Sequence, residues 1–161
     1  HTSDLPDFLD YTMKNRTYRY FKGDALFPFG HGLSYTQFEY GKDLRVKSEE
    51  RRVKNSNAVT DYRLEFTLYN KGTREGTEVA QVYIKRMADT DGPIKTLKAY
   101  KRVSLKAGES QNVSIDLPRK SFEVWDAQTN TMRVLPGKYQ VFVGGSSADA
   151  AKNVIEVKVK K

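Results

Sequence analysis

Hydrophobic and polar residues alternate along most of the chain after residue 44. The pattern is clearest in residues 62–70, YRLEFTLYN, where charged and hydroxyl side chains separate the apolar ones. The apolar positions are Tyr62, Leu64, Phe66 and Leu68. Because successive side chains of a strand point to opposite faces, this segment is predicted to be a strand with one face in a core.

Seven further segments show the same alternation, or a short β-like run, between turn residues. They are residues 44–48, 78–85, 97–105, 111–118, 131–135, 137–145 and 154–160. Pro118 closes one of them, because proline cannot donate to a strand ladder. Seven or eight strands without a convincing helix predict an all-β, immunoglobulin-like antiparallel sandwich over residues 44–161.

The segment 78–85, EVAQVYIK, illustrates which side chains should be covered and which exposed. One set of alternate positions is predicted to face inward: Ala80, Val82 and Ile84. Gln81 and Tyr83 point to the opposite face. Since an antiparallel sandwich commonly buries only one face of each strand, we expect these two side chains at the surface.

The first 40 residues have a different composition and hold ten of the nineteen aromatic residues. Residues 19–40, RYFKGDALFPFGHGLSYTQFEY, contain seven rings among glycines and one proline, with no helical or strand periodicity. We therefore predict an extended segment, residues 1–43, here called the strap. Burying a large apolar side chain gains about 1.5 to 3 kcal/mol, so the strap is expected to pack partly on the sandwich and partly on another surface.

Charge and composition exclude several kinds of partner. The net charge of +8 raises nucleic acid as a ligand, but the basic residues are spread along the chain rather than clustered, so no nucleic-acid partner is predicted. No apolar run approaches the roughly 20 residues of a membrane span, and no membrane association is expected. The absence of cysteine excludes disulfides, thiolate metal sites and cysteine nucleophiles.

The titratable residues form no catalytic or metal-binding pattern. The two histidines, His1 and His31, cannot make a three-histidine metal site. Asp89 and Asp91 match only a fragment of a calcium loop, because the bidentate glutamate is missing. Three aspartates precede the aromatic run near a possible turn: Asp4, Asp7 and Asp10. We predict no catalytic residue, no metal and no cofactor in this chain.

Four segments in order carry a family resemblance. They are NRTYRYFKGDALFPFGHGLSYTQFEY, LYNKGTREGTEVAQVYI, PIKTLKAYKRVSLKAGE and SFEVWDAQTNTMRVLPGKYQVFVGGSS. Together they closely resemble the C-terminal, fibronectin type III-like domain of glycoside hydrolase family 3 enzymes, and they span nearly the whole chain. Small departures from the family wording occur at Asn15, His31 and Ala107. The N-terminal wording is similar to that of β-glucosidase and β-xylosidase members.

The resemblance implies a complete enzyme of three domains. A barrel carries an aspartate nucleophile, an α/β domain often supplies the acid/base glutamate, and this sandwich follows them. The implied reaction is retaining hydrolysis of a β-glycosidic bond by two carboxyl groups roughly 5 to 5.5 Å apart. Neither catalytic domain fits in 161 residues, so the isolated chain is expected to be inactive. Glucoside versus xyloside specificity stays open, and a periplasmic or extracellular location is expected from the family.

The resemblance also suggests what covers the strap. We expect its aromatic residues to contact the barrel and the α/β domain of the same polypeptide, and to promote self-association when this piece stands alone. The expected contact residues are Tyr18, Tyr20, Phe21, Phe27, Phe29, His31 and Tyr35.

A carbohydrate-binding module is the alternative interpretation. Sugars stack on exposed rings, and five aromatic residues are candidates for outward faces: Tyr69, Tyr83, Tyr100, Trp125 and Phe142. The sequence does not bring these rings together. Trp125 next to Asp126 is interpreted as a packed corner residue, and isolated surface aromatics need no function.

Overall fold

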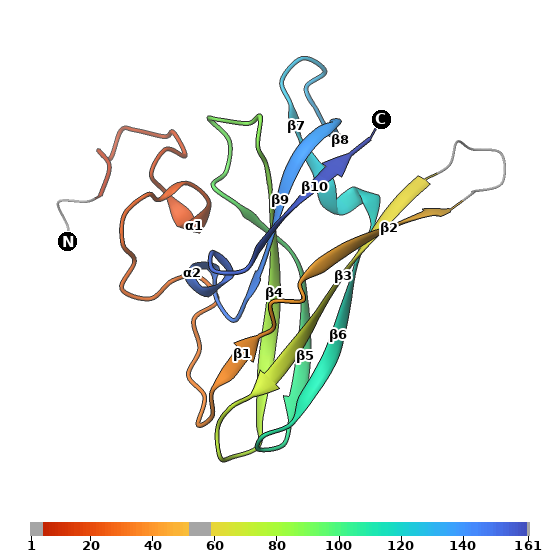
Figure 1. Cartoon of the computed structure of the whole chain (residues 1–161). Coiled ribbons are helices and arrows are strands. Elements are labelled where there is room, and N and C mark those ends of the chain that lie inside the picture. Colours follow the sequence, from red (N-terminus) through yellow and green to blue (C-terminus); the bar gives the residue numbers. More distant parts are fainter. Residues whose placement is uncertain (1–4, 52–58, 161) are drawn as a thin grey trace.

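The computed structural model describes residues 5–51 and 59–160 and has two four-stranded antiparallel sheets packed face to face (Figure 1). Sheet A contains β1 (Phe38–Tyr40), β2 (Arg45–Arg51), β3 (Val59–Asn70) and β6 (Ser110–Leu117). Sheet B contains, in spatial order, β10 (Val154–Val159), β9 (Gly137–Gly144), β4 (Gly76–Arg86) and β5 (Thr96–Leu105). A separate hairpin consists of β7 (Glu123–Asp126) and β8 (Thr131–Val134).

Within sheet A, β3 is the central strand. Its first half pairs with β2 and its last three residues pair with β1, while β6 runs along the other edge. The strap therefore ends by joining the sheet, since β1 lies before residue 43. The division of the chain at that residue stays a prediction.

The predicted all-β antiparallel sandwich is confirmed, and each of the eight predicted segments contains a strand. The described residues hold ten strands, because the three-residue β1 and the four-residue β7 were not predicted. Three short helices were also missed: α1 (Thr17–Tyr20), η2 (Arg119–Phe122) and α2 (Ser147–Ala150). Elements of three or four residues are too short to establish a periodicity.

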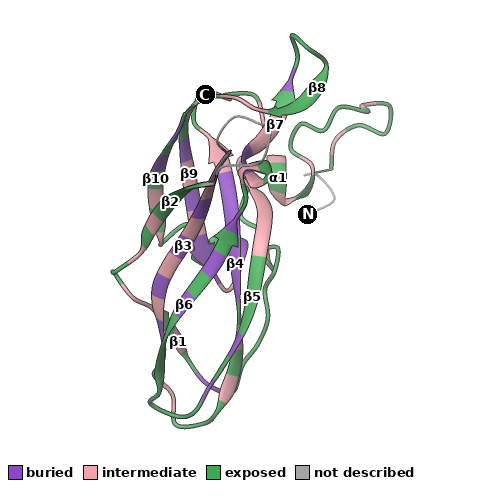
Figure 2. Cartoon of the chain, turned by 90° about the vertical axis from the view of Figure 1, so that its right-hand side faces the viewer, coloured by how far each residue is buried: buried purple, intermediate pink, exposed green. Residues whose placement is uncertain are grey.

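The core lies between the two sheets and is made by the alternating positions. Sheet A contributes from β3 the predicted inward set, Tyr62, Leu64, Phe66 and Leu68, all at most 5% exposed. Sheet B contributes Val82 from β4 and Val141 from β9, both fully buried. Phe122 of η2 closes one end, with its ring centroid 4.7 Å from that of Tyr62 and 5.5 Å from that of Tyr139. Figure 2 shows this burial along β3, β4 and β9.

The central strand β4 departs from the expected pattern. Ala80, Val82 and Ile84 face the core as predicted. Gln81 and Tyr83 on the opposite face are nevertheless 7% and 0% exposed. The expectation that these two side chains lie at the surface is wrong, because another part of the chain covers the outer face of sheet B.

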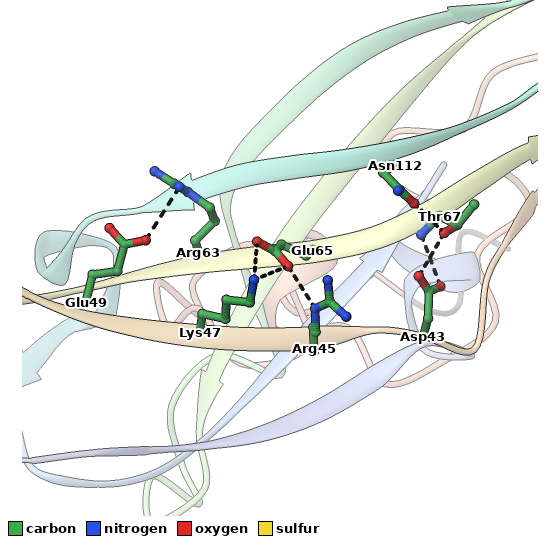
Figure 3. A network of polar contacts seen from close by, with 8 residues as sticks. All are labelled: Asp43, Arg45, Lys47, Glu49, Arg63, Glu65, Thr67 and Asn112. Atoms are coloured by element: carbon green, nitrogen blue, oxygen red, sulfur yellow. Dashed lines mark hydrogen bonds and ion pairs between the residues drawn. The ribbon is translucent and has the colours of Figure 1, made fainter.

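The outer face of sheet A is a solvent face. Figure 3 shows charged side chains of both signs on β2 and β3 at this face. The carboxylate of Glu65 forms ion pairs with the guanidinium of Arg45 at 2.8 Å and with the ammonium of Lys47 at 2.9 Å. On the same face, the guanidinium of Arg63 lies 2.7 Å from the carboxylate of Asp116 in β6. These ion pairs place opposite charges side by side on an exposed face, which is typical of a strand face in contact with solvent.

Within residues 5–51 and 59–160, no helix is long and apolar enough to cross a membrane.

Leu64→Ala is expected to lower the free energy of unfolding by about 2 to 5 kcal/mol, because the fully buried side chain leaves a cavity between the sheets. Urea denaturation followed by far-UV circular dichroism measures the loss. Lys47→Gln, on the solvent face, is the control and should leave the midpoint nearly unchanged, since exposed ion pairs contribute little. Equal effects of both substitutions would contradict the assigned core.

Candidate interdomain surface

The strap lies against the outer face of sheet B. Figure 1 shows it beside α2, β9 and β4, on the side away from β2, β3 and β6. It is this segment that covers Gln81 and Tyr83 and explains their burial. The strap thus packs on the outer face of sheet B, which the alternation of residues in β4 had predicted to be exposed to solvent.

Three rings form the main anchor of the strap. Tyr18 and Phe29, both from the strap, stack with centroids 3.9 Å apart and planes 13° from parallel. Their edges meet the ring of Tyr83 at centroid distances of 6.1 and 6.5 Å, in near-perpendicular geometry. Such edge-to-face pairs add about 0.5 to 1.5 kcal/mol beyond the burial of area. Two distant turns of the strap are therefore fixed on one buried tyrosine.

Hydrogen bonds fix the same two turns. The hydroxyl of Tyr18 accepts from the backbone amide of Leu97 at 3.1 Å, and the carbonyl of Phe29 accepts from the amide of Ser147 at 2.8 Å. The carbonyl of Arg19 accepts from the amide of Ile94 at 2.6 Å. The backbone of the strap is therefore paired with β5, with the loop before it, and with the start of α2.

Gln81 links the strap to the loop after β9. Its amide nitrogen donates to the carbonyls of Gly30 at 3.1 Å and Gly145 at 2.5 Å, while its amide oxygen accepts from the hydroxyl of Tyr83 at 2.6 Å. Gly30 has a φ of +79°, and a Cβ there would lie 2.0 Å from the Gln81 amide oxygen. Only glycine both adopts this positive φ readily and leaves room for the Gln81 side chain, which explains the first glycine of the FGHG stretch.

Lys95, in the loop before β5, links α2 to the aromatic rings on the outer face of sheet B. Its ammonium donates to the carbonyl of Ser147 and lies 5.8 Å from the ring centroid of Tyr83 and 5.4 Å from that of Phe142. Burial lowers the pKa of this amine. The aromatic faces and the carbonyl offset part of the cost of burying the charge.

The end of the strap is fixed by a buried amide. Asn70, 1% exposed at the end of β3, accepts from the hydroxyl of Thr36 at 2.5 Å. Its own amide nitrogen donates to the carbonyls of Arg74 and Leu105 at 2.7 and 3.1 Å. The strap is consequently held at both its aromatic turns and its junction with sheet A.

The strap also exposes large apolar side chains. Leu33 and Tyr35 are 95% and 94% exposed, although they flank the anchored turn at Gly30. Further exposed members are Leu5, Phe8, Leu9, Tyr11, Met13, Leu26 and Phe27. This set, with Leu33 and Tyr35, is called the outer face of the strap. An apolar group of this size on an anchored segment is typical of a surface that another protein part covers.

The structure divides the predicted contact residues into two groups. Tyr18 and Phe29 pack on Tyr83 of the sandwich, although Phe29 stays 43% exposed, and Tyr20 and Phe21 are half-buried. Phe27, His31 and Tyr35 are exposed, and the His31 ring lies 5.5 Å from that of Phe27. The exposed leucines of the outer face were not predicted as contact residues. They could have been, because they are apolar residues in the same segment without periodicity as the predicted rings.

A half-buried carboxylate lies in the cleft between the strap and sheet B. Glu78 accepts from the hydroxyl of Tyr40 at 2.9 Å, and Gly145 leaves it room, since a Cβ there would lie 2.3 Å from the Glu78 carboxylate. Burial raises the pKa of Glu78, the hydrogen bond from Tyr40 lowers it, and the charge of Asp149 raises it further. Burial likewise raises the pKa of Tyr40.

The polar residues beside this cleft have structural partners. Asp149 accepts from the Ser146 hydroxyl at 2.8 Å and from the Lys152 ammonium at 2.9 Å. Ser146 in turn accepts from the Asp149 amide at 3.2 Å and caps α2. In the described part of the chain, no group of three or more His, Asp or Glu side chains is arranged to hold a metal.

The five rings considered for sugar stacking do not form one exposed platform. Tyr83 is buried, and Tyr69 and Phe142 are half-buried beneath lysine ammonium groups. Tyr100 and Trp125 are exposed, but they belong to β5 and to the separate hairpin. The interpretation of Trp125 as a packed corner residue is wrong, because its side chain is 56% exposed.

Comparison with known proteins gives a consistent set of relatives. Residues 78–147 match the fibronectin type III-like domain family. The chain is 47% identical to a xylan 1,4-beta-xylosidase of Xylanibacter ruminicola over 145 residues, which are 90% of this chain and 16% of that protein. A beta-glucosidase of Kluyveromyces marxianus in complex with glucose superposes with a TM-score of 0.70 at 34% identity, over 86% of this chain and 16% of that one. A GH3 beta-glucosidase of Bifidobacterium adolescentis superposes with a TM-score of 0.66 at 33% identity, over 82% of this chain and 18% of that one.

The sandwich and the matched residues define a fibronectin type III-like domain. Its relatives are glycosidases that are far longer than the matched segment, and the chain spans about one-sixth of their length. The chain belongs to the fibronectin type III-like domains of glycoside hydrolase family 3 enzymes, as the resemblance implied.

Gly30→Ala is expected to loosen the strap while leaving the sandwich folded, because the new methyl group overlaps Gln81 and the backbone needs a positive φ. The amide of Ser147, which donates to Phe29, should then exchange at least about tenfold faster, as expected for roughly 1.4 kcal/mol of lost protection. Hydrogen exchange with mass spectrometry measures this.

Gly32→Ala is the matched control, since nothing lies within 4 Å of a Cβ at that position. Its exchange pattern should equal that of the parent chain. If both alanine variants behave alike, the anchoring role of Gly30 is refuted.

Glu78→Gln is expected to raise the melting temperature at pH 7.5 and to have no such effect near pH 4. The folded-state pKa of Glu78 is raised, so its stabilising contribution is complete at low pH and is lost as the pH rises through that pKa. Glutamine keeps an acceptor for Tyr40 but carries no charge. Thermal melts from pH 4 to 8 test this.

The other charged or titratable groups of this cleft are His31, Glu39, Tyr40, Asp149 and Lys152. Glu156→Gln on β10, whose side chain is 53% exposed, serves as the control. A pH-independent gain in Glu78→Gln would contradict the assignment of the effect to the buried charge.

Proposed function

We propose that this domain braces the catalytic part of a longer family 3 glycosidase and contacts it through the outer face of the strap. One observation supports the proposal above all: the strap is anchored to the sandwich and nevertheless exposes large apolar side chains. The domain supplies no catalytic group. Its proposed role is to hold the barrel and the α/β domain of the same polypeptide in place.

The size of the relatives supports a partner within the same chain. The matched segment makes up only 16% to 18% of each of the three relatives compared above, which leaves most of each protein to contact it. A partner in the same polypeptide is present at high effective concentration, so moderate apolar contacts suffice for stable docking.

The energetics favour a covered strap. Leu33 and Tyr35 are almost fully exposed in the isolated chain, and burying each would gain about 1.5 to 3 kcal/mol. The predicted contact set contributes in two ways under this proposal. Tyr18 and Phe29 orient the strap, while Phe27, His31 and Tyr35, with Leu26 and Leu33, make the interdomain contact.

The complete enzyme is proposed to hydrolyse terminal β-D-glucosides or β-D-xylosides with retention of configuration. This follows from the family and from the printed activities of the relatives, a beta-xylosidase and beta-glucosidases. The two carboxyl groups of that reaction are expected in the barrel and the α/β domain. The isolated chain should therefore leave nitrophenyl glycosides unhydrolysed and self-associate through the uncovered strap. A periplasmic or extracellular location stays a prediction from the family.

A chimeric enzyme tests the bracing role. In it, this chain replaces the matching 16% of the Xylanibacter ruminicola xylosidase. The double substitution Leu33→Ser/Tyr35→Ser is expected to lower the midpoint of thermal inactivation of the chimera by about 4 to 8 °C, from the loss of two buried apolar side chains in a large protein. Residual xylosidase activity after heating measures the midpoint.

The same double substitution should leave the melting temperature of the isolated chain unchanged at dilutions where the chain is monomeric, because both side chains are exposed there. Lys47→Ser, on the solvent face of sheet A, should affect neither protein. A chimera that is insensitive to the double substitution would rule out the strap as the contact surface.

A further inference from the structure

The β7–β8 hairpin projects beyond the end of the sandwich (Figure 1). Within the described residues, its two strands pair only with each other, in four antiparallel residue pairs. A two-stranded hairpin alone is marginally stable, so this one depends on contacts at its base with η2. Figure 2 shows the hairpin and the N-terminal segment on the same side of the two sheets.

An exposed apolar pair lies on one face of this hairpin. Trp125 of β7 and Met132 of β8 are directly opposite each other and are 56% and 53% exposed. Trp125 is the only tryptophan of the chain. A tryptophan fixed on a hydrogen-bonded element is typical of the anchor residues of protein interfaces, and methionine adapts its shape to an apolar partner.

The hairpin holds this pair in a defined orientation. Asp126, 8% exposed on the opposite face, accepts from the amide of Gln128 at 3.1 Å and from the hydroxyl of Thr129 at 2.9 Å. It also lies 3.4 Å from the guanidinium of Arg133. These contacts fix the turn between the strands.

The hairpin is continuous with the strap. The ammonium of Lys98 in β5 donates to the carbonyl of Glu123 at the start of β7, at 3.1 Å. Burial lowers the pKa of Lys98, the negative charge of Glu123 raises it, and the positive charge of Arg19 in α1 lowers it. The carbonyl of Arg19 in turn accepts from the amide of Ile94. One contiguous part of the surface therefore joins the strap, the start of β5 and the base of the hairpin.

We infer that the Trp125–Met132 pair is a second docking element, which packs on an apolar surface of the catalytic part of the same polypeptide. The inference rests on the proposed function, because it names the same partner as the strap. The hairpin adds a contact at the end of the sandwich, so the domain would be held at two separated points and could not pivot about the strap.

The pair is too small to bind a second copy of the chain by itself, which favours the catalytic part of the same polypeptide as its partner. A stable interface between independent molecules buries about 800 Å² on each partner, which two half-exposed side chains do not supply. The pair becomes effective when the strap already holds the partner close by. The outer face of the strap and the hairpin then form one larger interface.

Hydroxyl-radical footprinting with mass spectrometry tests the inference, with the isolated chain and the chimeric xylosidase as samples. Trp125 and Met132 should be oxidised at least about threefold more slowly in the chimera, as expected for side chains at the centre of an interface. Tyr69, on the outer face of sheet A, is the control and should react equally in both. Tyr35 reports on the strap in the same experiment.

The outcomes separate the two proposals. Protection of Tyr35 without protection of Trp125 and Met132 would overturn the docking role of the hairpin and leave the strap contact intact. Protection of neither would overturn both. Protection of Trp125 in the isolated chain at high concentration, or by added xylo-oligosaccharide, would identify a second copy or a sugar as the occupant and would also overturn the inference.

A substitution gives an independent measure. Trp125→Ala should lower the inactivation midpoint of the chimera by about 2 to 4 °C and leave the melting temperature of the isolated chain within about 1 °C. Met132→Ser is a second variant that keeps the tryptophan, and it should shift the chimera in the same direction. Equal shifts in the isolated chain and the chimera would assign the pair to hairpin stability and exclude docking.

Discussion

The packing of Tyr18 and Phe29 on Tyr83 determines how this domain can be used. Together with Gly30 these rings cover Gln81 and Tyr83 on the outer face of β4, so this part of the strand is covered on both sides. The N-terminal strap consequently behaves as a third layer of the sandwich. Its backbone carbonyls at Arg19, Phe29 and Gly30 are all paired with the sandwich, which fixes the direction in which the remaining side chains of the strap point.

The two outer faces of the sandwich are therefore physically different. On sheet A, charges of opposite sign pair around Glu65 and Arg63 on an exposed face. On sheet B, the anchored strap turns leucine, phenylalanine and tyrosine side chains outward. An apolar surface on a rigid support loses little conformational entropy when it docks, which suits a domain that braces another part of its own chain. The half-buried Glu78 in the cleft beneath the strap adds a pH dependence to this arrangement.

The relation to family 3 glycosidases suggests why the two outer faces of the sandwich differ. Most of the length of each relative lies outside the matched segment, and the outer face of the strap is the proposed place where that remainder docks. The exposed Trp125–Met132 pair is inferred to add a second contact near the end of the sandwich. Both elements are supported by polar contacts that hold them in place, by Gln81 in one case and by Asp126 in the other. A domain without catalytic groups can influence an enzyme in this way, through the position of its neighbours.

The sequence by itself determined the strands and the core, because alternation is a local property and a side chain such as Leu64 can be assigned to the inner face from its neighbours alone. The ordered motifs likewise determined the family. Only the tertiary structure decided that Tyr83 and Gln81 are buried and that Trp125 is exposed. Burial of those outward positions depends on a segment some sixty residues away in the chain, and exposure of the tryptophan depends on a hairpin that pairs with neither sheet. Contacts between distant segments leave no periodicity in either of them, so the division of the strap into anchored and uncovered rings required the structure.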